Sequence, residues 1–178
     1  LLLADRGGRQ RLLGRDASRA AVPPGAEVVE IGGYEDDDGM QAALAGASAF
    51  LLIPGHETSD RVHAHGAAIR SAVAAGTGRI VQLSFAGAAP GATFTYARDH
   101  WATEEAVRAS GLPWTIARMN FYLDVLPEFV LPSGDLAGPA GEGKVAAVAR
   151  DDVAAALAAI LTGDEHVGRV YELSGPQA

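Results

Sequence analysis

Residues 80–121 read IVQLSFAGAAPGATFTYARDHWATEEAVRASGLPWTIARMNF, and their pattern indicates how the chain is built. They predict a strand over residues 80–84, a helix from about residue 97 to 110 and a strand over residues 114–118. A Gly- and Ala-rich loop precedes the helix, and a Gly-Leu-Pro turn follows it. The stretch also gathers the polar residues that could carry chemistry or hold a cofactor: Ser84, Tyr96, His100, Glu104, Arg118 and Asn120.

Strand-like and helix-like runs alternate on both sides of this unit. We predict further strands at residues 9–14, 26–31, 49–53 and 169–173, the end of a helix at 1–6, a short helix broken by Pro127 at 122–130, and loop over 132–150. Three more helices are predicted to start at the acidic or hydroxyl residues Asp36-Asp37-Asp38, Ser59-Asp60 and Asp151-Asp152, the second of them carrying Val62, Ile69 and Val73. The alternation is typical of right-handed βαβ units, so the expected fold class is α/β with a parallel sheet.

Composition limits the function classes. The 178 residues suffice for one domain with a sizeable core. A formal net charge of −8 argues against nucleic-acid or anionic-membrane partners, which need basic surfaces. The sequence has no cysteine, which fits a reducing compartment, and we expect a cytoplasmic protein. No apolar run approaches the roughly 20 residues that span a bilayer. Because no initiator Met is present, we expect a fragment.

Ligands of open parallel sheets bind at the carboxyl ends of the strands. In this sequence those ends are Gly14-Arg15, Ile53-Pro54-Gly55, Ser84-Phe85 and Arg118-Met119-Asn120. We expect a ligand site where these four segments meet.

Several motifs resemble one known family. They are His100-x-x-x-Glu104, the run from Ser110 to Phe121, Gly138 to Val145 with Arg150 to Ala154, and Gly168 to Gly175, with weaker matches at residues 14–19 and 44–47. Their order and spacing resemble the NmrA-like branch of the atypical short-chain dehydrogenases, and within it the NAD(P)H:quinone oxidoreductase type 2 group. The resemblance implies a Rossmann-like, doubly wound, mostly parallel sheet with helices on both faces. Residues 1–178 would be one NAD(P)-binding domain, and residues 119–150 part of an incomplete substrate-binding lobe.

The chain departs from this family at its front. The family begins with a strand and a Gly-rich turn that holds the dinucleotide pyrophosphate. Gly7-Gly8 does not fit that turn, because it lies at a helix end and precedes a strand-like run. The family's first strand lies in the middle of the sheet, so its absence would take hydrogen-bond partners from two neighbours. We therefore expect poor stability or altered strand pairing.

The resemblance assigns cofactor-binding roles. Arg15 would face the adenosine ribose, where a guanidinium can pair with a 2′-phosphate, and Arg19 could assist. This favours NADP(H) over NAD(H), although Asp16 could instead bind a ribose hydroxyl as in NAD enzymes. The remaining predicted cofactor-binding residues are Ile53, Pro54, Gly55, Ser84, Phe85 and Asn120.

The predicted catalytic residues are Tyr96 and His100. Standard short-chain dehydrogenases have Tyr-x-x-x-Lys, in which the fixed charge lowers the tyrosine pKa. Here His100 replaces the lysine, so either a weakened triad with Ser84 operates, or His100 helps form the pocket without a classical tyrosine. Glu104 could orient His100 or be an exposed helical acid. Asn120 could border the pocket or cap a helix.

Phe121 and Tyr122 are the predicted substrate-pocket residues. A metal is not predicted, because His63 and His65 are two positions apart on a helix and point to different faces, and His56 adds no ligand spacing.

The sequence thus predicts an NAD(P)H-dependent oxidoreductase that reduces a quinone or similar small carbonyl acceptor by direct hydride transfer. The main alternative is a non-catalytic, NADP(H)-binding, redox-sensing regulator of the NmrA type. A third possibility is a remnant that binds no cofactor.

Overall fold

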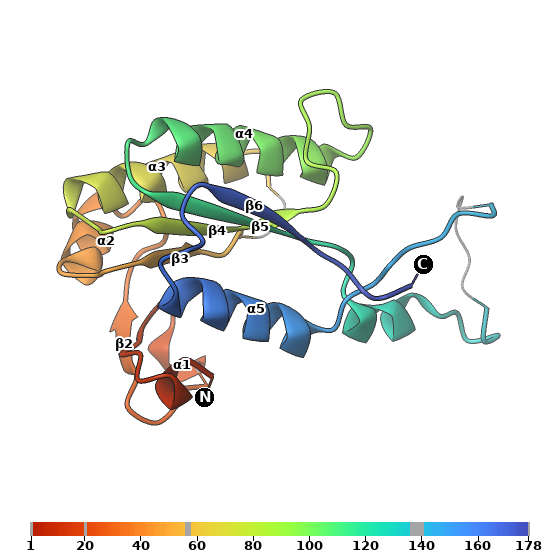
Figure 1. The fold of residues 1–178 in the computed structure, drawn as a ribbon, viewed down its shortest axis with the longest axis horizontal. Helices are drawn as coiled ribbons and strands as arrows, with labels where there is room; N and C mark the ends of the chain where they lie inside the picture. The colour runs from red at the N-terminus through yellow and green to blue at the C-terminus, as the bar shows by residue number, and fades with distance from the viewer. Residues whose placement is uncertain (1, 20, 56–57, 136–140, 178) are drawn as a thin grey trace.

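The computed structural model describes residues 2–19, 21–55, 58–135 and 141–177 (Figure 1). In these ranges six strands form two sheets, and all strand pairs are parallel. The larger sheet has the order β3 (Phe50–Leu52), β4 (Ile80–Phe85), β5 (Trp114–Met119) and β6 (Arg169–Leu173). The smaller sheet pairs β1 (Arg11–Gly14) with β2 (Glu27–Glu30).

Helices cover both faces of the larger sheet. Figure 1 shows α3 (Arg61–Ala74) and α4 (Thr95–Ala109) on one face and α5 (Arg150–Thr162) on the other. The remaining helices are short: α1 (Leu2–Asp5), α2 (Asp37–Leu44), and the 3-10 helices η1 (Ala17–Arg19) and η2 (Leu123–Phe129). The predicted α/β, doubly wound, parallel class is therefore confirmed.

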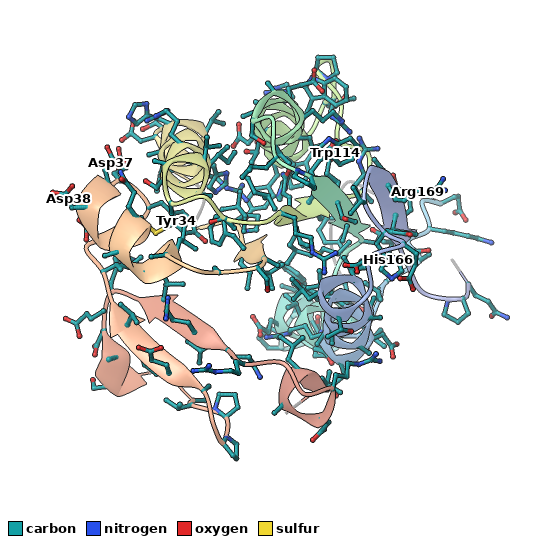
Figure 2. All side chains as sticks on the ribbon, turned by 60° about the vertical axis from the view of Figure 1, so that its left-hand side comes forward. Tyr34, Asp37, Asp38, Trp114, His166 and Arg169 are labelled. Atoms are coloured by element: carbon teal, nitrogen blue, oxygen red, sulfur yellow. The ribbon has the colours of Figure 1, made fainter. Side chains whose placement is uncertain are left out.

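The two sheets are separated between β1 and β3. Each of these strands pairs with one neighbour only, β1 with β2 and β3 with β4, so within the described ranges both have a free edge. Figure 2 shows the smaller sheet standing apart from the larger one. The interruption lies where the resemblance predicts a central strand, and β1 and β3 do not pair with each other across it.

The core lies on the two faces of β4. All six residues of β4 are buried, because helices pack on both sides of it. One cluster joins α2, α3 and β3 around Met40, Leu52 and Ile69, and the other joins β4, β5 and α5 around Val81 and Leu157. Ser84 and Phe85, at the carboxyl end of β4, are therefore held in place by strand pairing and by packing on both faces.

The helix starts differ in part from the prediction. Asp36 is the N-cap of α2, and its side chain accepts a hydrogen bond from the Gly39 N–H at 3.1 Å. Asp60 occupies the N-cap position of α3, which confirms the predicted start of that helix, but its side chain makes no cap hydrogen bond. The cap predicted at Asp151-Asp152 is wrong: α5 starts after Ala149, and both acids lie in its first turn, where they suit the helix dipole.

The buried face of α3 also differs from the prediction. Val62 and Val73 are 37% and 42% exposed. Ile69 is buried as expected, and α3 also buries Arg61, His65, Ala68 and Ala72 at helical spacing. An arginine and a histidine on the inner face are unusual, since buried charged groups need partners. Arg61 contacts the predicted catalytic residues Tyr96 and His100, and His65 contacts the predicted cofactor-binding residue Gly55.

Among the described residues, no helix combines the length and the apolar character needed to cross a membrane.

Candidate functional site

The predicted ligand residues lie at the carboxyl ends of the parallel strands. Arg15 follows β1; it is exposed and has no ion-pair partner among the described residues. Ile53 follows β3 and is 52% exposed, and a Cβ built on Gly55 would meet nothing within 4 Å. The end of β1 therefore offers a free guanidinium to a ligand, and the end of β3 offers an exposed side chain and open space beside Gly55. Of Arg19, the structure describes only the backbone.

The loop after β3 is anchored from two sides. The Tyr34 hydroxyl donates to the carbonyl of Ile53 at 2.6 Å, and burial raises the pKa of Tyr34 to about 12. The Gly55 N–H donates to His65 Nε2 at 3.3 Å. His65 Nδ1 then donates to Thr103 Oγ1 on α4 at 2.9 Å, so the loop is tied through α3 to α4.

An aromatic pocket opens at the ends of β4 and β5. It has a volume of about 490 Å³, within the range of small-molecule sites. Phe85, Phe94 and Phe121 form its wall, with ring centroids 5.3 Å (Phe85–Phe121), 5.6 Å (Phe85–Phe94) and 6.3 Å (Phe94–Phe121) apart. Phe85 is buried, whereas Phe94 and Phe121 are 45% and 43% exposed. The exposed rings leave apolar surface for a flat ligand.

Asn120 completes this wall on the β5 side. Its Oδ1 accepts a hydrogen bond from the Phe121 N–H at 2.8 Å, which leaves the amide nitrogen as a donor without a partner among the described residues. Asn120 is not the cap of η2, whose N-cap is Tyr122. Tyr122 itself does not line the pocket and packs instead against the cluster around Val81.

A buried arginine lies behind the aromatic wall. Arg61 is 2% exposed, its Cζ lies 3.9 Å from the centroid of the Tyr96 ring, and its Nη2 is 3.1 Å from His100 Nε2. Its Nε and Nη1 have no hydrogen-bond partner, and within the described ranges no carboxylate pairs with it. A guanidinium can only donate, so His100 Nε2 is the acceptor and its ring proton lies on Nδ1.

His100 is therefore a neutral imidazole. Burial lowers its pKa to about 3, and the charge of Arg61 acts in the same direction. His65 has the same two causes and a pKa lowered to about 4. The His100 ring lies 5.4 Å from that of Tyr96 and 6.0 Å from that of Phe85, so the predicted pair is brought together. His100 is 2% exposed and does not itself line the pocket.

Glu104 does not orient His100, and it is not exposed; both alternatives considered for it are wrong. It is fully buried and accepts hydrogen bonds from Ser84 Oγ at 2.6 Å, from Arg118 Nε and Nη2 at 2.8 Å, and from Arg108 Nη2 at 3.0 Å. Burial acts to raise its pKa, but the bonds from Arg118 and Ser84 outweigh it and hold the pKa below its usual range. Ser84 is thus committed to a structural hydrogen bond inside the protein.

The histidines considered as metal ligands lie apart from one another. His63 is on the surface of α3, 3.6 Å from Glu35, whereas His65 is buried toward α4. His56 lies outside the described residues, and the remainder show no group of three metal-ligating side chains.

Sequence reasoning missed three site residues: Arg61, Phe94 and Lys144. The burial of Arg61 could have been predicted, because positions 61, 65, 68 and 72 form one face of the helix. Phe94 and Lys144 lie in loops, whose folded positions periodicity does not predict.

Together, fold and site define a Rossmann-like domain with an aromatic pocket at the carboxyl edge of its sheet. A family model described as NAD(P)H-binding matches residues 1–164, so the chain belongs to that NAD(P)H-binding family. The sequence resemblance to NAD(P)H-dependent reductases is confirmed.

Individual relatives agree with this assignment. The chain is 36% identical over 184 residues to a (4-alkanoyl-5-oxo-2,5-dihydrofuran-3-yl)methyl phosphate reductase of Streptomyces griseus, covering 99% of this chain and 62% of the relative. It is 34% identical over 148 residues to quinone oxidoreductase 2 of Escherichia coli, covering 82% and 51%. The crystal structure of the NADPH-dependent quinone oxidoreductase QOR2 of E. coli with NADPH superposes with a TM-score of 0.84 at 29% identity, covering 99% and 64%. The chain therefore spans about half to two thirds of these relatives.

Proposed function

We propose that this chain forms the nucleotide-binding part of an NADPH-dependent reductase that transfers hydride to a quinone or a similar small conjugated carbonyl compound. The observation that carries the proposal is the Phe85–Phe94–Phe121 pocket at the carboxyl edge of the sheet, beside the neutral His100. The relatives named as a quinone oxidoreductase and as a reductase of an unsaturated lactone support this acceptor class.

The residues at the edge fit a dinucleotide. Arg15 has a free guanidinium for a 2′-phosphate, with Arg19 nearby in sequence. At the end of β3, Ile53 is half-exposed and Gly55 leaves space for a ligand beside its Cα. When bound, the dihydronicotinamide supplies the hydride. The protein's part is to hold the ring against Phe85 and Asn120, with the acceptor beside Phe121, and to exclude water with the aromatic wall.

The acceptor chemistry needs little acid catalysis. A quinone that gains one hydride and one proton becomes a hydroquinone, and the proton can come from solvent. His100 Nε2 accepts from Arg61 and carries no proton to give. We propose that His100 and Arg61 act as positioning residues for the Tyr96 ring, which stacks on the pocket residue Phe94 and whose hydroxyl has no partner among the described residues.

Steady-state oxidation of NADPH and of NADH by a simple quinone tests the proposal. We expect quinone-dependent oxidation with a higher kcat/KM for NADPH. Arg15→Gln should lower kcat/KM for NADPH about tenfold, the effect of losing one charged hydrogen bond, and leave NADH nearly unchanged. Equal losses for both nucleotides would remove Arg15 from 2′-phosphate recognition.

A redox-sensing regulator remains the second candidate, because His100 replaces the lysine of Tyr-x-x-x-Lys and gives no proton through Nε2. A sensor would bind NADPH, visible as a change in nicotinamide fluorescence, without consuming it in the presence of quinone.

A further inference from the structure

Among the described residues that line the pocket, one side chain is charged. Lys144 is the one lysine of the sequence, and it lines the pocket together with Val145 and Ala146. No carboxylate is present among the described lining residues, although the chain has a formal net charge of −8. Lys144 is exposed, and the described residues offer its ammonium no hydrogen bond or ion pair.

The other lining groups define what the ammonium can recognise. Two half-exposed rings, Phe94 and Phe121, favour a flat, conjugated ligand. The free amide nitrogen of Asn120 can donate to a carbonyl oxygen. A cation beside an apolar wall and an amide donor fits a ligand that is aromatic or conjugated on one side and negatively charged on the other.

We propose that the pocket selects conjugated acceptors that carry an anionic group, such as a carboxylate, sulfonate or phosphate, and that Lys144 binds this group. This specificity rests on the proposed reductase function for the reaction itself. The recognition of the anion is a property of the pocket alone and can be measured without turnover.

Matched acceptors test the proposal by kinetics. Naphthoquinone and its sulfonate differ in charge and also in reactivity, so the informative quantity is how each variant changes the ratio of their kcat/KM values. Lys144→Gln should lower kcat/KM for the sulfonate about five- to tenfold through KM, as expected for a partly exposed ion pair, and leave naphthoquinone within twofold. Lys144→Arg should retain the preference, because it keeps the charge.

A control separates a local contact from a change in net charge. Arg169 is exposed at the start of β6, next to β5 as Figure 2 shows, and so lies at the opposite end of the sheet from the pocket. Arg169→Gln changes the net charge by the same amount and should leave the sulfonate preference unchanged. Added salt should weaken the preference in the wild type and have little effect in Lys144→Gln.

Binding of non-reducible probes makes the two proposals separable. Naphthalenesulfonate should bind the wild type more tightly than the neutral naphthalenesulfonamide, and Lys144→Gln should abolish the difference. If this holds while no acceptor consumes NADPH, the reductase function is wrong and the anion site stands. If NADPH is consumed but neither probe nor acceptor depends on Lys144, the anion site is wrong and the reductase function stands.

Discussion

The two buried histidines, His65 and His100, link the site to pH. Both have a folded-state pKa lowered from the ordinary value near 6.5, to about 4 and about 3. A lowered histidine pKa means that the unfolded chain binds more protons below pH 6.5 than the folded chain does. Stability is therefore fully present above about pH 6.5 and is lost as the pH falls toward 4.

We predict that the free energy of unfolding falls by about 1.4 kcal/mol per pH unit for each histidine between about pH 6 and 4. Urea unfolding at a series of pH values measures this slope. His100→Gln should reduce the slope by about 1.4 kcal/mol per pH unit, the contribution of one histidine. His63 lies on the exposed side of the same helix as His65, so His63→Gln should leave the slope unchanged. A slope that does not change in His100→Gln would mean that His100 titrates normally in the folded protein.

At the scale of elements, Glu104 connects α4 with β4 and β5 and, through Arg118, with β6. From α4 it accepts hydrogen bonds from Ser84 on β4 and Arg118 on β5, and Arg118 also reaches Glu172 on β6 at 3.1 Å. Removing one partner of a buried ion pair leaves an uncompensated charge inside the protein. This network fixes α4, and with it Tyr96 and His100, against the carboxyl end of the sheet.

Glu104→Gln should therefore destabilise the protein by about 3 kcal/mol, because Arg118 loses its buried countercharge. The neighbouring Glu105 provides a matched control: it is half-exposed and pairs only with Arg108, so Glu105→Gln should cost below about 0.5 kcal/mol. Thermal or urea unfolding of both variants measures the difference. Similar small losses for both would show that Glu104 is not a structural ion pair.

The elements also show how far sequence patterns reach. Apolar runs and turn residues predicted β3, β4, β5 and the start of α2 at Asp36 within a few residues. The roles of Ser84 and Glu104 could not be predicted, because they depend on which side chains meet across α4, β4 and β5. On α3 the apolar pattern is a poor guide to burial, because Arg61 and His65 are buried whereas Val62 and Val73 are exposed.

For the whole molecule, the separation of the two sheets predicts uneven stability. A two-stranded sheet is marginal by itself, whereas β4 is paired on both sides and buried throughout. Amides of Val28 and Val29 in β2 should therefore exchange with solvent deuterium well before those of Val81 and Leu83 in β4. Equal protection of both sets would show that β1 and β2 unfold together with the larger sheet.

For the whole molecule, the sequence predicts a parallel α/β fold, and the two parallel sheets observed within the described ranges confirm it. The pocket was only partly predictable. Strand ends indicated Phe85 and Asn120, but Phe94 and Lys144 come from loops about 50 residues apart that only the folded chain brings together.

We propose, above all, that this chain supports hydride transfer from NADPH to a conjugated carbonyl acceptor. The most direct measurement is single-turnover mixing of the protein with NADPH and a quinone, with deuterium in place of the transferred hydrogen of the dihydronicotinamide. The account predicts that NADPH is consumed only when quinone is present, and that deuterium slows its consumption. NADPH that binds, as nicotinamide fluorescence would show, but is not consumed by any quinone would contradict the account and favour the redox sensor.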